Sequence, residues 1–234
     1  MLSGRTSLRL QADFIRIASV GSFSRAQSST PVVDKIVCIG KNYLEHAREL
    51  GDAVPDKPVI FNKPWSCAVA CAASGDTVNV TLPENRGVVH FETEIVVKVG
   101  PNNTIADATL GLDMTLRELQ SQLKKNSHPW EIGKIFPGAA VIGPWCGLDL
   151  QQYMDREFSL QLDGQLRQKG TGSQMRMKPN DMIAYISEYF EVVEGDLIFT
   201  GTPAGVGPVR NGQTAHISWR DLLSFDVQFL PPHA

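Results

Sequence analysis

Short segments of alternating apolar and polar residues, separated by glycine, proline and asparagine, make up most of the chain after about residue 32. Such alternation places successive side chains on opposite faces of a strand, so it predicts strands rather than long helices. The glycines and prolines between the segments are typical of turns. The expected strands cover residues 32–39, 76–82, 88–99, 196–200 and 223–229. A chain patterned in this way is expected to fold as an α+β domain dominated by β-structure.

One hairpin and two helices complete this outline. The Asp-Gly dipeptide at 163–164 favours a type I′ turn, which predicts a hairpin over residues 158–168. A short helix is expected over residues 43–50. Asn180 is a favourable N-cap residue, so a second helix is expected from about 181 to 190.

Size and charge exclude several classes of protein. The chain has 234 residues, which is enough for one domain with a tail. Lys and Arg number 22 against 25 Asp and Glu, and this net charge of −3 disfavours nucleic acid as a partner. No segment reaches the roughly 18 consecutive apolar residues of a transmembrane helix, so no membrane partner is expected. Four cysteines in a chain of this length do not form a disulfide framework, which fits a reducing compartment.

The first thirty residues differ in composition from the rest. Within residues 1–33, four arginines accompany a single acidic residue, Asp13, and serine is frequent. An arginine-rich, serine-rich segment with few acids is typical of an organelle transit peptide. We expect a mitochondrial transit peptide or disordered leader over residues 1–30, followed by a catalytic domain over residues 31–234 in the matrix. A plain disordered tail is the alternative, and the protein would then be cytosolic.

Acidic residues recur at alternate positions of the expected strand 88–99. Strand alternation places His90, Glu92 and Glu94 on one face, with the two glutamates about 6.6 Å apart at Cα. Two carboxylates in a partly buried site repel each other unless a cation binds between them. An edge strand that exposes solvated acids is the alternative interpretation.

A third acid precedes an expected helix. Thr115 and Glu118 have the spacing of a capping box, which predicts that a helix starts there and that Asp113 lies in the loop before it. A third oxygen ligand from such a loop suits Mg²⁺ or Mn²⁺. On this helix Arg117 and Gln120 are three residues apart and share a face.

Other segments carry groups suited to acid–base chemistry or anion binding. His46 and Glu49 are three residues apart on the expected short helix, so the carboxylate can orient the imidazole as part of an acid–base pair. Lys134 can bind a substrate carboxylate. The glycine-rich segment 200–207, which includes Thr202, can bring backbone amides and hydroxyls close to a carboxylate. An incidental surface pair, a surface lysine and a plain turn are the respective alternatives.

Taken in order, these segments resemble those of the fumarylacetoacetate hydrolase family. The resemblance spans about residues 34–230 and is carried by residues 40–46, 90–94, 112–120, 129–136 and 200–207. It implies a roll of mixed β-sheets around a divalent metal, usually in a homodimer, and a small 2-oxo acid as substrate. It also implies a Mg²⁺ site, with Mn²⁺ as an alternative, formed by Glu92, Glu94 and Asp113.

The same resemblance assigns the remaining roles. His46 and Glu49 would activate water or guide a proton, and Lys134 would stabilise charge on the substrate. The residues expected around the substrate are Arg117, Gln120 and Thr202. The implied enzyme hydrolyses acylpyruvates and decarboxylates oxaloacetate through a pyruvate enolate.

Two alternative functions remain open from the sequence. An oxaloacetate keto–enol tautomerase needs the same enolate stabilisation without C–C cleavage. An inactive family member is the other alternative, because only eighteen residues separate Glu94 from Asp113. A parallel crossover needs about a dozen residues besides its strands. The short link therefore predicts a truncated strand before Asp113 and an impaired metal site.

Overall fold

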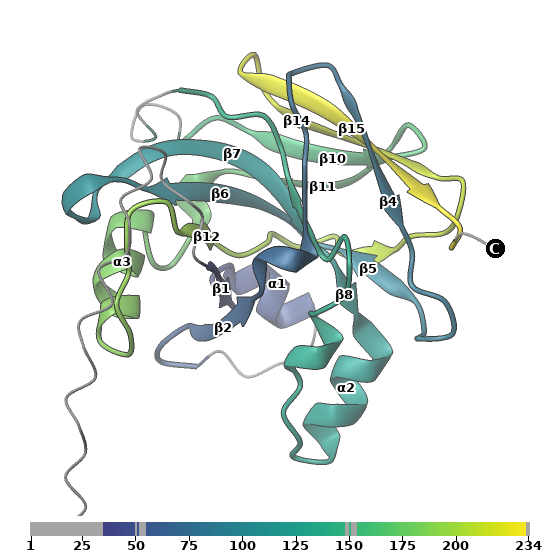
Figure 1. Cartoon of the computed structure of the whole chain (residues 1–234), viewed down its shortest axis with the longest axis horizontal. Helices are drawn as coiled ribbons and strands as arrows, with labels where there is room; N and C mark the ends of the chain where they lie inside the picture. The colour runs from purple at the N-terminus through teal and green to yellow at the C-terminus, as the bar shows by residue number, and fades with distance from the viewer. Residues whose placement is uncertain (1–34, 50, 52–54, 148–149, 151–153, 233–234) are drawn as a thin grey trace, which may run out of the picture. The chain divides into compact units, whose positions relative to one another are not determined.

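The structure is a computed structural model that describes residues 35–49, 51, 55–147, 150 and 154–232. The leader expected over residues 1–30 lies outside the described residues. The described part is mostly β-structure with three short helices, as the sequence predicts (Figure 1). No helix in this part is long and apolar enough to cross a membrane.

Most strands belong to two sheets, and both sheets contain parallel and antiparallel pairs. The seven-stranded sheet has the order β2 (Val59–Lys63), β1 (Ile36–Gly40), β12 (Leu197–Phe199), β6 (Thr93–Val99), β7 (Ile105–Asp113), β9 (Ala140–Ile142) and β3 (Ala68–Ala70). The five-stranded sheet has the order β11 (Gln165–Gly170), β10 (Phe158–Leu162), β14 (Thr214–Trp219), β15 (Leu223–Leu230) and β4 (Thr77–Thr81).

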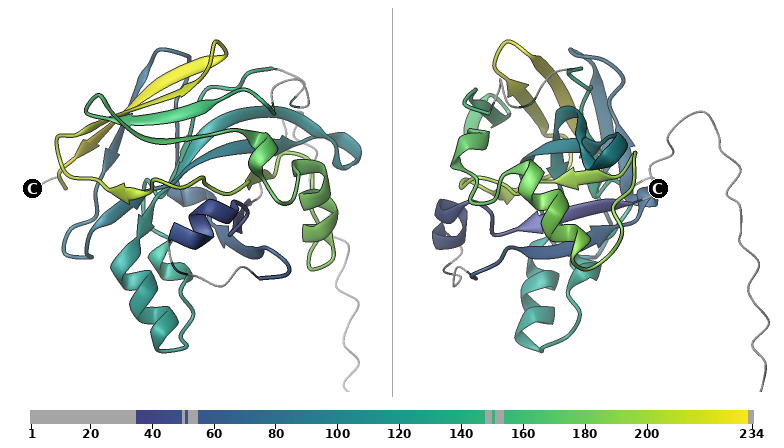
Figure 2. Two further views of the ribbon diagram at one scale, coloured as in Figure 1. Left: turned by 180° about the vertical axis from the view of Figure 1, so that it is seen from behind. Right: turned by 90° about the vertical axis from the view of Figure 1, so that its left-hand side faces the viewer.

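A small third sheet and three helices complete the described part. The sheet has the order β13 (Gly207–Pro208), β5 (Val89–Phe91) and β8 (Thr115–Leu116). The helices are α1 (Leu44–Glu49), α2 (Arg117–Lys125) and α3 (Pro179–Ser187). Figures 1 and 2 show α2 on the side away from the five-stranded sheet.

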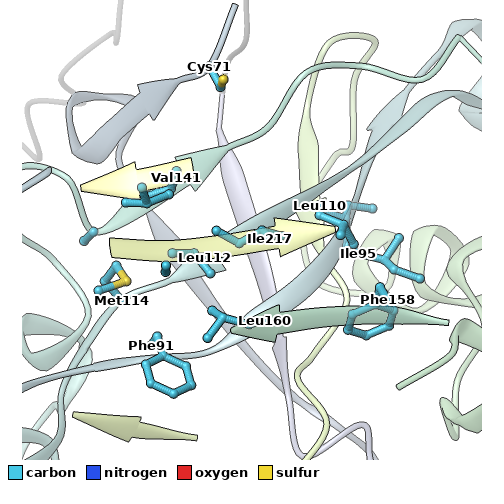
Figure 3. Packing of buried hydrophobic residues seen from close by; sticks show 14 of the residues in the cluster. Cys71, Phe91, Ile95, Leu110, Leu112, Met114, Val141, Phe158, Leu160 and Ile217 are labelled. Carbon is cyan, nitrogen blue, oxygen red and sulfur yellow. The ribbon is translucent and has the colours of Figure 1, made fainter. Parts of the chain in front are cut away.

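The main hydrophobic core lies between the two large sheets. Ile95 and Leu110, from β6 and β7, pack in one cluster with Phe158, Leu160 and Ile217 from the five-stranded sheet (Figure 3). Side chains alternate along β6, so Ile95 points into this core and its two neighbours in sequence point to the opposite face of the sheet. That opposite face carries the polar groups described below.

The link between Glu94 and Asp113 is an antiparallel hairpin, and the expectation of a parallel crossover with a truncated strand is wrong. Strands β6 and β7 pair directly through a turn at Pro101–Asn103, so eighteen residues are sufficient. Gly111 lies opposite Glu94 in this ladder. A Cβ at Gly111 would lie 2.5 Å from the carbonyl oxygen of Val141, so the close approach of the strands requires glycine. The length of this link therefore gives no reason to expect an impaired metal site.

Other local predictions have mixed outcomes. The predicted hairpin is confirmed: β10 and β11 pair, and residues 163 and 164 have the positive φ values of a type I′ turn. The expected strand 88–99 is broken at Glu92 into β5 and β6. Helix α3 begins at Pro179 and ends at Ser187, so the prediction that Asn180 is its N-cap residue is wrong. Proline is favoured at the first helical position because its φ is already helical.

The capping box predicted at Thr115 is also wrong. Thr115 pairs with His90 in the small sheet, and helix α2 starts at Arg117 without a side-chain cap. The hydroxyl of Thr115 donates to the carbonyl of Asp113. Asp113 is therefore the last residue of strand β7 and does not lie in a loop. A strand end holds this carboxylate more firmly than a loop.

Candidate active site

Three carboxylates meet at one end of the β6–β7 hairpin. Glu92 and Glu94 are two residues apart, so both side chains leave the same face of the chain. Asp113 lies across from them, because its backbone N–H donates to the carbonyl of Glu92 at 2.8 Å. All three are buried, and each offers an oxygen within 4.8 Å of the other two. The structure thus brings together the three residues predicted to bind metal.

His90 does not join these carboxylates, contrary to the expectation that it shares their face. The break at Glu92 ends the regular alternation and directs His90 into the small third sheet. There it is half-buried in a separate hollow that Glu118 also lines. Alternation fails here because His90 and Glu94 belong to different sheets.

Three cations surround the carboxylates. Lys134 follows a short 3₁₀ turn, and its Nζ lies 2.7 Å from Glu92 Oε2 and 2.6 Å from Asp113 Oδ2. Lys63 extends from β2 and places its Nζ 2.8 Å from Asp113 Oδ1. Arg117, the first residue of α2, pairs with Glu92 Oε1. Every oxygen of Glu92 and Asp113 therefore faces a cation.

Burial and charge move the pKa values of these groups in different directions. Burial alone would raise the pKa of Glu92, but Lys134 and Arg117 more than offset this and lower it below its usual range. Burial alone would lower the pKa of Lys134, but the neighbouring carboxylates raise it. The pKa of Glu94 is raised well above its usual value, first by burial and then by Asp113 and Glu92. Glu94 is therefore the carboxylate of the three whose ionised form is least stabilised by its surroundings.

The donor set fits a hard divalent cation. Three carboxylates that converge from a rigid hairpin are the oxygen ligands that Mg²⁺ and Mn²⁺ prefer. Asp113 Oδ1 is buried and has no hydrogen-bond donor among the described residues. Lys63 lies beside it, but this ammonium donates to the carbonyls of Met114, Lys134 and Ala139. The oxygen keeps its lone pairs available for a cation.

His46 and Glu49 form the predicted pair on helix α1. The Nδ1 of His46 lies 3.1 Å from Glu49 Oε2, and the other oxygen of Glu49 accepts the backbone N–H of Gly205 at 3.0 Å. His46 is buried and lines the same cavity as the three carboxylates. Because the Glu49 carboxylate can only accept, Nδ1 carries the proton and Nε2 is left as the basic nitrogen.

The glycine-rich segment 200–207 is tied to strand β6. The hydroxyls of Thr200 and Thr202 each donate to a backbone carbonyl of β6 at 2.8 Å. The backbone N–H of Gly201 donates to Glu94 Oε2 at 2.7 Å. The predicted amide–carboxylate contact thus exists, but the carboxylate belongs to the protein. Thr202 still lines the cavity.

A cavity of about 270 Å³ connects these groups. Arg117 and Gln120, which hydrogen-bond each other at 3.0 Å, form part of its wall. The apolar part of the wall is formed by Ile39, Val59, Phe61 and Trp130. Of the nine residues predicted for the site, all but Glu49 line the cavity, and Glu49 lies behind His46.

Two buried polar residues of the site were missed in the sequence. Lys63 is fully buried beside Asp113. Gln168, also buried, accepts the N–H of Thr93 and donates to the hydroxyl of Thr202. Lys63 stands two residues after Phe61, so a strand would place both side chains on one face, but the sequence pattern did not predict a strand here. Gln168 gives no signal in the sequence.

Residues 35–231 match the sequence profile described as the fumarylacetoacetate (FAA) hydrolase C-terminal family. This match covers nearly the whole described part. The chain belongs to the fumarylacetoacetate hydrolase family. The family resemblance and the fold expected from it are confirmed.

Family members of several names are similar to this chain. The mitochondrial oxaloacetate tautomerase FAHD2 of Oryza sativa subsp. japonica is 39% identical over 87% of this chain and 95% of its own length. The mitochondrial oxaloacetate decarboxylase of Dictyostelium discoideum is 36% identical over 83% of this chain and 92% of its own. The fumarylpyruvate hydrolase of Pseudomonas aeruginosa, solved in complex with Mn²⁺ and pyruvate, superimposes with a TM-score of 0.79. It is 33% identical, over 88% of this chain and 94% of its own.

The raised pKa of Glu94 predicts a pH dependence of stability in the metal-free protein. The folded chain holds the Glu94 proton more tightly than the unfolded chain does. Folding stability therefore falls as pH rises from the ordinary glutamate pKa towards the raised value. Glu94→Gln removes this linkage, so the variant should not show that decline and should exceed metal-free wild type above the window.

Urea unfolding in EDTA at several pH values measures this effect. Glu118→Gln is the matched control, because Glu118 is an exposed glutamate. The control should follow the wild-type pH dependence. An equal decline in Glu94→Gln and wild type would show that Glu94 is not the group responsible.

Proposed function

We propose that this chain is a metal-dependent enzyme that hydrolyses acylpyruvates at a C–C bond and decarboxylates oxaloacetate. The observation that carries this proposal is one cavity lined by the carboxylate cluster and by His46, which pairs with Glu49 behind it. The cluster suits binding of a 2-oxo acid, and the pair suits transfer of a proton. The family members named as decarboxylase and fumarylpyruvate hydrolase support the same chemistry.

In this proposal Glu92, Glu94 and Asp113 hold Mg²⁺, or Mn²⁺ as in the Pseudomonas aeruginosa relative. When bound, such an ion supplies a Lewis acid for a 2-oxo acid. Lys134 lies beside the cluster and provides a fixed positive charge for the oxygen of the departing pyruvate enolate. Lys134 therefore favours cleavage of the C–C bond, because this cleavage leaves negative charge on the enolate oxygen.

The other proposed residues bind substrate or move a proton. Arg117, Gln120 and Thr202 lie on the cavity wall and orient the acid. For an acylpyruvate, Nε2 of His46 takes a proton from water, and the hydroxide attacks the distal carbonyl. Glu49 stabilises the resulting imidazolium through Nδ1. The C–C bond of this adduct then breaks to give a carboxylic acid and the pyruvate enolate, and the proton that His46 took from water converts the enolate into pyruvate.

Oxaloacetate needs no attacking water. Loss of CO₂ leaves the same pyruvate enolate, whose charge Lys134 stabilises, and protonation again gives pyruvate. One site can therefore perform both reactions, with the His46–Glu49 pair essential for hydrolysis.

Oxaloacetate keto–enol tautomerisation is the second candidate. The Oryza sativa relative carries this name, and the same enolate stabilisation with a proton transfer from His46 is sufficient for it. The two candidates differ in product, because tautomerisation releases no pyruvate. Incubating purified protein and Mg²⁺ with acetylpyruvate and with oxaloacetate, while following pyruvate release and enol decay separately, tests both. Enol decay without pyruvate from either substrate would contradict C–C cleavage and favour the tautomerase.

We also propose that residues 1–30 direct the catalytic domain, residues 31–234, to the mitochondrial matrix. The arginine-rich composition and the mitochondrial names of several relatives support this. Protein isolated from its native cell is expected in the mitochondrial fraction, with an N-terminus near residue 28 by sequencing. An intact Met1 or a purely cytosolic distribution would contradict it. The homodimer implied by the family resemblance remains a prediction, and its molar mass in solution can be measured by light scattering.

A further inference from the structure

Strand β6 loses one of its neighbouring strands just before the chain reaches the carboxylate cluster. Its ladder with β12 ends at the pair of Val96 with Phe199, and the next backbone bond joins Thr200 to Ile95. Thr93 lies beyond the end of this ladder and is fully buried. Buried backbone N–H and C=O groups are almost always hydrogen-bonded, so the peptide groups of Thr93 need partners other than β12.

Two buried side chains supply these partners. The N–H of Thr93 donates to Gln168 Oε1 at 2.9 Å, and the carbonyl of Thr93 accepts the hydroxyl of Thr202 at 2.8 Å. The amide nitrogen of Gln168 donates in turn to Thr202 Oγ1 at 2.8 Å, which closes a ring of three hydrogen bonds. The same nitrogen also donates to the carbonyl of Pro203 at 2.8 Å. A reversed amide would place its oxygen against this carbonyl, so the network permits one orientation of the side chain.

The backbone of β11 is shaped to bring Gln168 to this position. Its ladder with β10 shifts register at Arg167, which has no paired residue on β10. A bulge of this kind redirects the side chains beside it. A Cβ at Gly205 would lie 2.0 Å from the carbonyl oxygen of Arg167, so the glycine-rich segment packs directly on the bulge. Because the N–H of Gly205 also donates to Glu49, this packing extends to the acid–base pair.

We infer that Gln168 is a positioning residue of the metal site and that it acts jointly with the hydroxyl of Thr202. This inference rests on the proposed metal-binding function. Thr93 stands between Glu92 and Glu94, so fixing its two peptide groups fixes the directions in which both carboxylates leave the chain. The carboxylates can share one ion only while their oxygens converge. Loss of a residue that orients metal ligands commonly lowers metal affinity by about 10–100-fold.

The hydroxyl of Thr202 has this role even without a substrate. Thr202 lies on the cavity wall, but its single hydroxyl proton is donated to the carbonyl of Thr93. Removing the hydroxyl should therefore weaken metal binding in the absence of any 2-oxo acid. A residue that only contacted the substrate would have no such effect.

Calorimetric titration of Mg²⁺ into EDTA-stripped full-length protein, without any 2-oxo acid, tests this inference. Gln168→Met keeps the length of the side chain and removes its hydrogen bonds, and Thr202→Val removes the hydroxyl. Each of these variants should lower Mg²⁺ affinity about tenfold. Thr202→Ser keeps the hydroxyl and should retain wild-type affinity.

Thr109→Val is the matched control for the loss of a buried hydrogen bond in the same sheet. Thr109 is fully buried on β7, and its hydroxyl donates to the carbonyl of Pro144 at 2.7 Å, outside the cavity. This variant should unfold at a lower urea concentration than wild type and still bind Mg²⁺ with wild-type affinity. A loss of Mg²⁺ affinity in Thr109→Val equal to that in Gln168→Met would overturn the inference, because general loosening of the sheet would then explain both.

The double variant Gln168→Met/Thr202→Val tests the joint action. Both single changes open the same ring, so the second change should add little to the first. We expect the double variant to lose Mg²⁺ affinity about 10–20-fold, against the roughly hundredfold loss of two independent sites. A hundredfold loss would show that the two residues act separately, contrary to the inference.

The outcomes also separate this inference from the proposed function. Wild-type Mg²⁺ affinity in Gln168→Met would overturn the inference and leave the metal site standing. If Gln168→Met does not fold, Thr202→Val and Thr202→Ser decide, because equal Mg²⁺ affinity in these two variants would overturn it as well. No Mg²⁺ binding by wild type would overturn the proposed metal-dependent function itself.

Discussion

His46→Ala is expected to lower kcat/KM for acetylpyruvate hydrolysis by about 10²-fold or more, the usual contribution of a general base. Decarboxylation of oxaloacetate is expected to fall less, because C–C cleavage there needs no activated water. Mg²⁺ binding should be unchanged, since His46 lies on α1 and is not one of the three proposed ligands. The measurement is kcat/KM for both substrates, with Mg²⁺ titrations on the same preparations.

Glu45→Ala is the matched control, because Glu45 is an exposed residue of the same short helix. It should retain wild-type kinetics for both substrates. Equal losses on both substrates in His46→Ala would indicate that His46 positions the substrate and does not activate water. Unchanged kinetics would remove His46 from the mechanism.

Asp113→Asn is expected to abolish the stabilisation of the folded chain by Mg²⁺. At a Mg²⁺ concentration about 100-fold above its Kd, wild type should gain about 2.7 kcal/mol in unfolding free energy. For a chain of this size that corresponds to a rise in Tm of about 5–11 °C. The variant should show no rise, because the amide oxygen replaces a charged ligand at the end of β7.

The metal-free variant should also be less stable than metal-free wild type by about 3–5 kcal/mol, because Lys63 and Lys134 lose their shared buried counter-charge. Asp107→Asn is the control, since Asp107 lies on the same strand but outside the cavity. Thermal scans with and without Mg²⁺ check both effects. A Mg²⁺-dependent rise in Tm for Asp113→Asn equal to that of wild type would exclude Asp113 as a ligand.

Local patterns predicted the parts of this site that depend on neighbours in sequence. The i, i+2 spacing of Glu92 and Glu94 and the i, i+3 spacing of His46 and Glu49 are set by strand and helix geometry. Both pairs meet as those spacings require. The turn at 163–164 likewise follows from its two residues.

Local sequence patterns did not predict the features that depend on contacts between residues far apart in the chain. Lys63 meets Asp113 across fifty residues, and its strand, β2, is too short to show a clear alternation. The Thr115–Glu118 spacing matched a capping box, but pairing of Thr115 with His90 in a sheet outweighed that local preference. The eighteen-residue link was judged as a crossover because sequence does not show which strands pair.

The ion pairs around the carboxylates place the proposed chemistry in a pre-formed site. Lys134 and Arg117 fix Glu92, and Gly201 fixes Glu94, before a ligand arrives. Groups held in this way need little reorganisation when charge develops on a substrate, which is how preorganised sites stabilise transition states. Helix α1 adds His46 to this fixed frame through the contact between Glu49 and Gly205.

The most direct test of the account measures metal occupancy and pyruvate release in the same samples. EDTA-stripped protein is titrated with Mg²⁺, and both quantities are followed for wild type and Glu94→Gln with acetylpyruvate and oxaloacetate. The account predicts that pyruvate release from both substrates rises in proportion to occupancy of one metal site per chain, and that Glu94→Gln shows neither binding nor release. Full pyruvate release from metal-free wild type, or unchanged Mg²⁺ binding by Glu94→Gln, would contradict it.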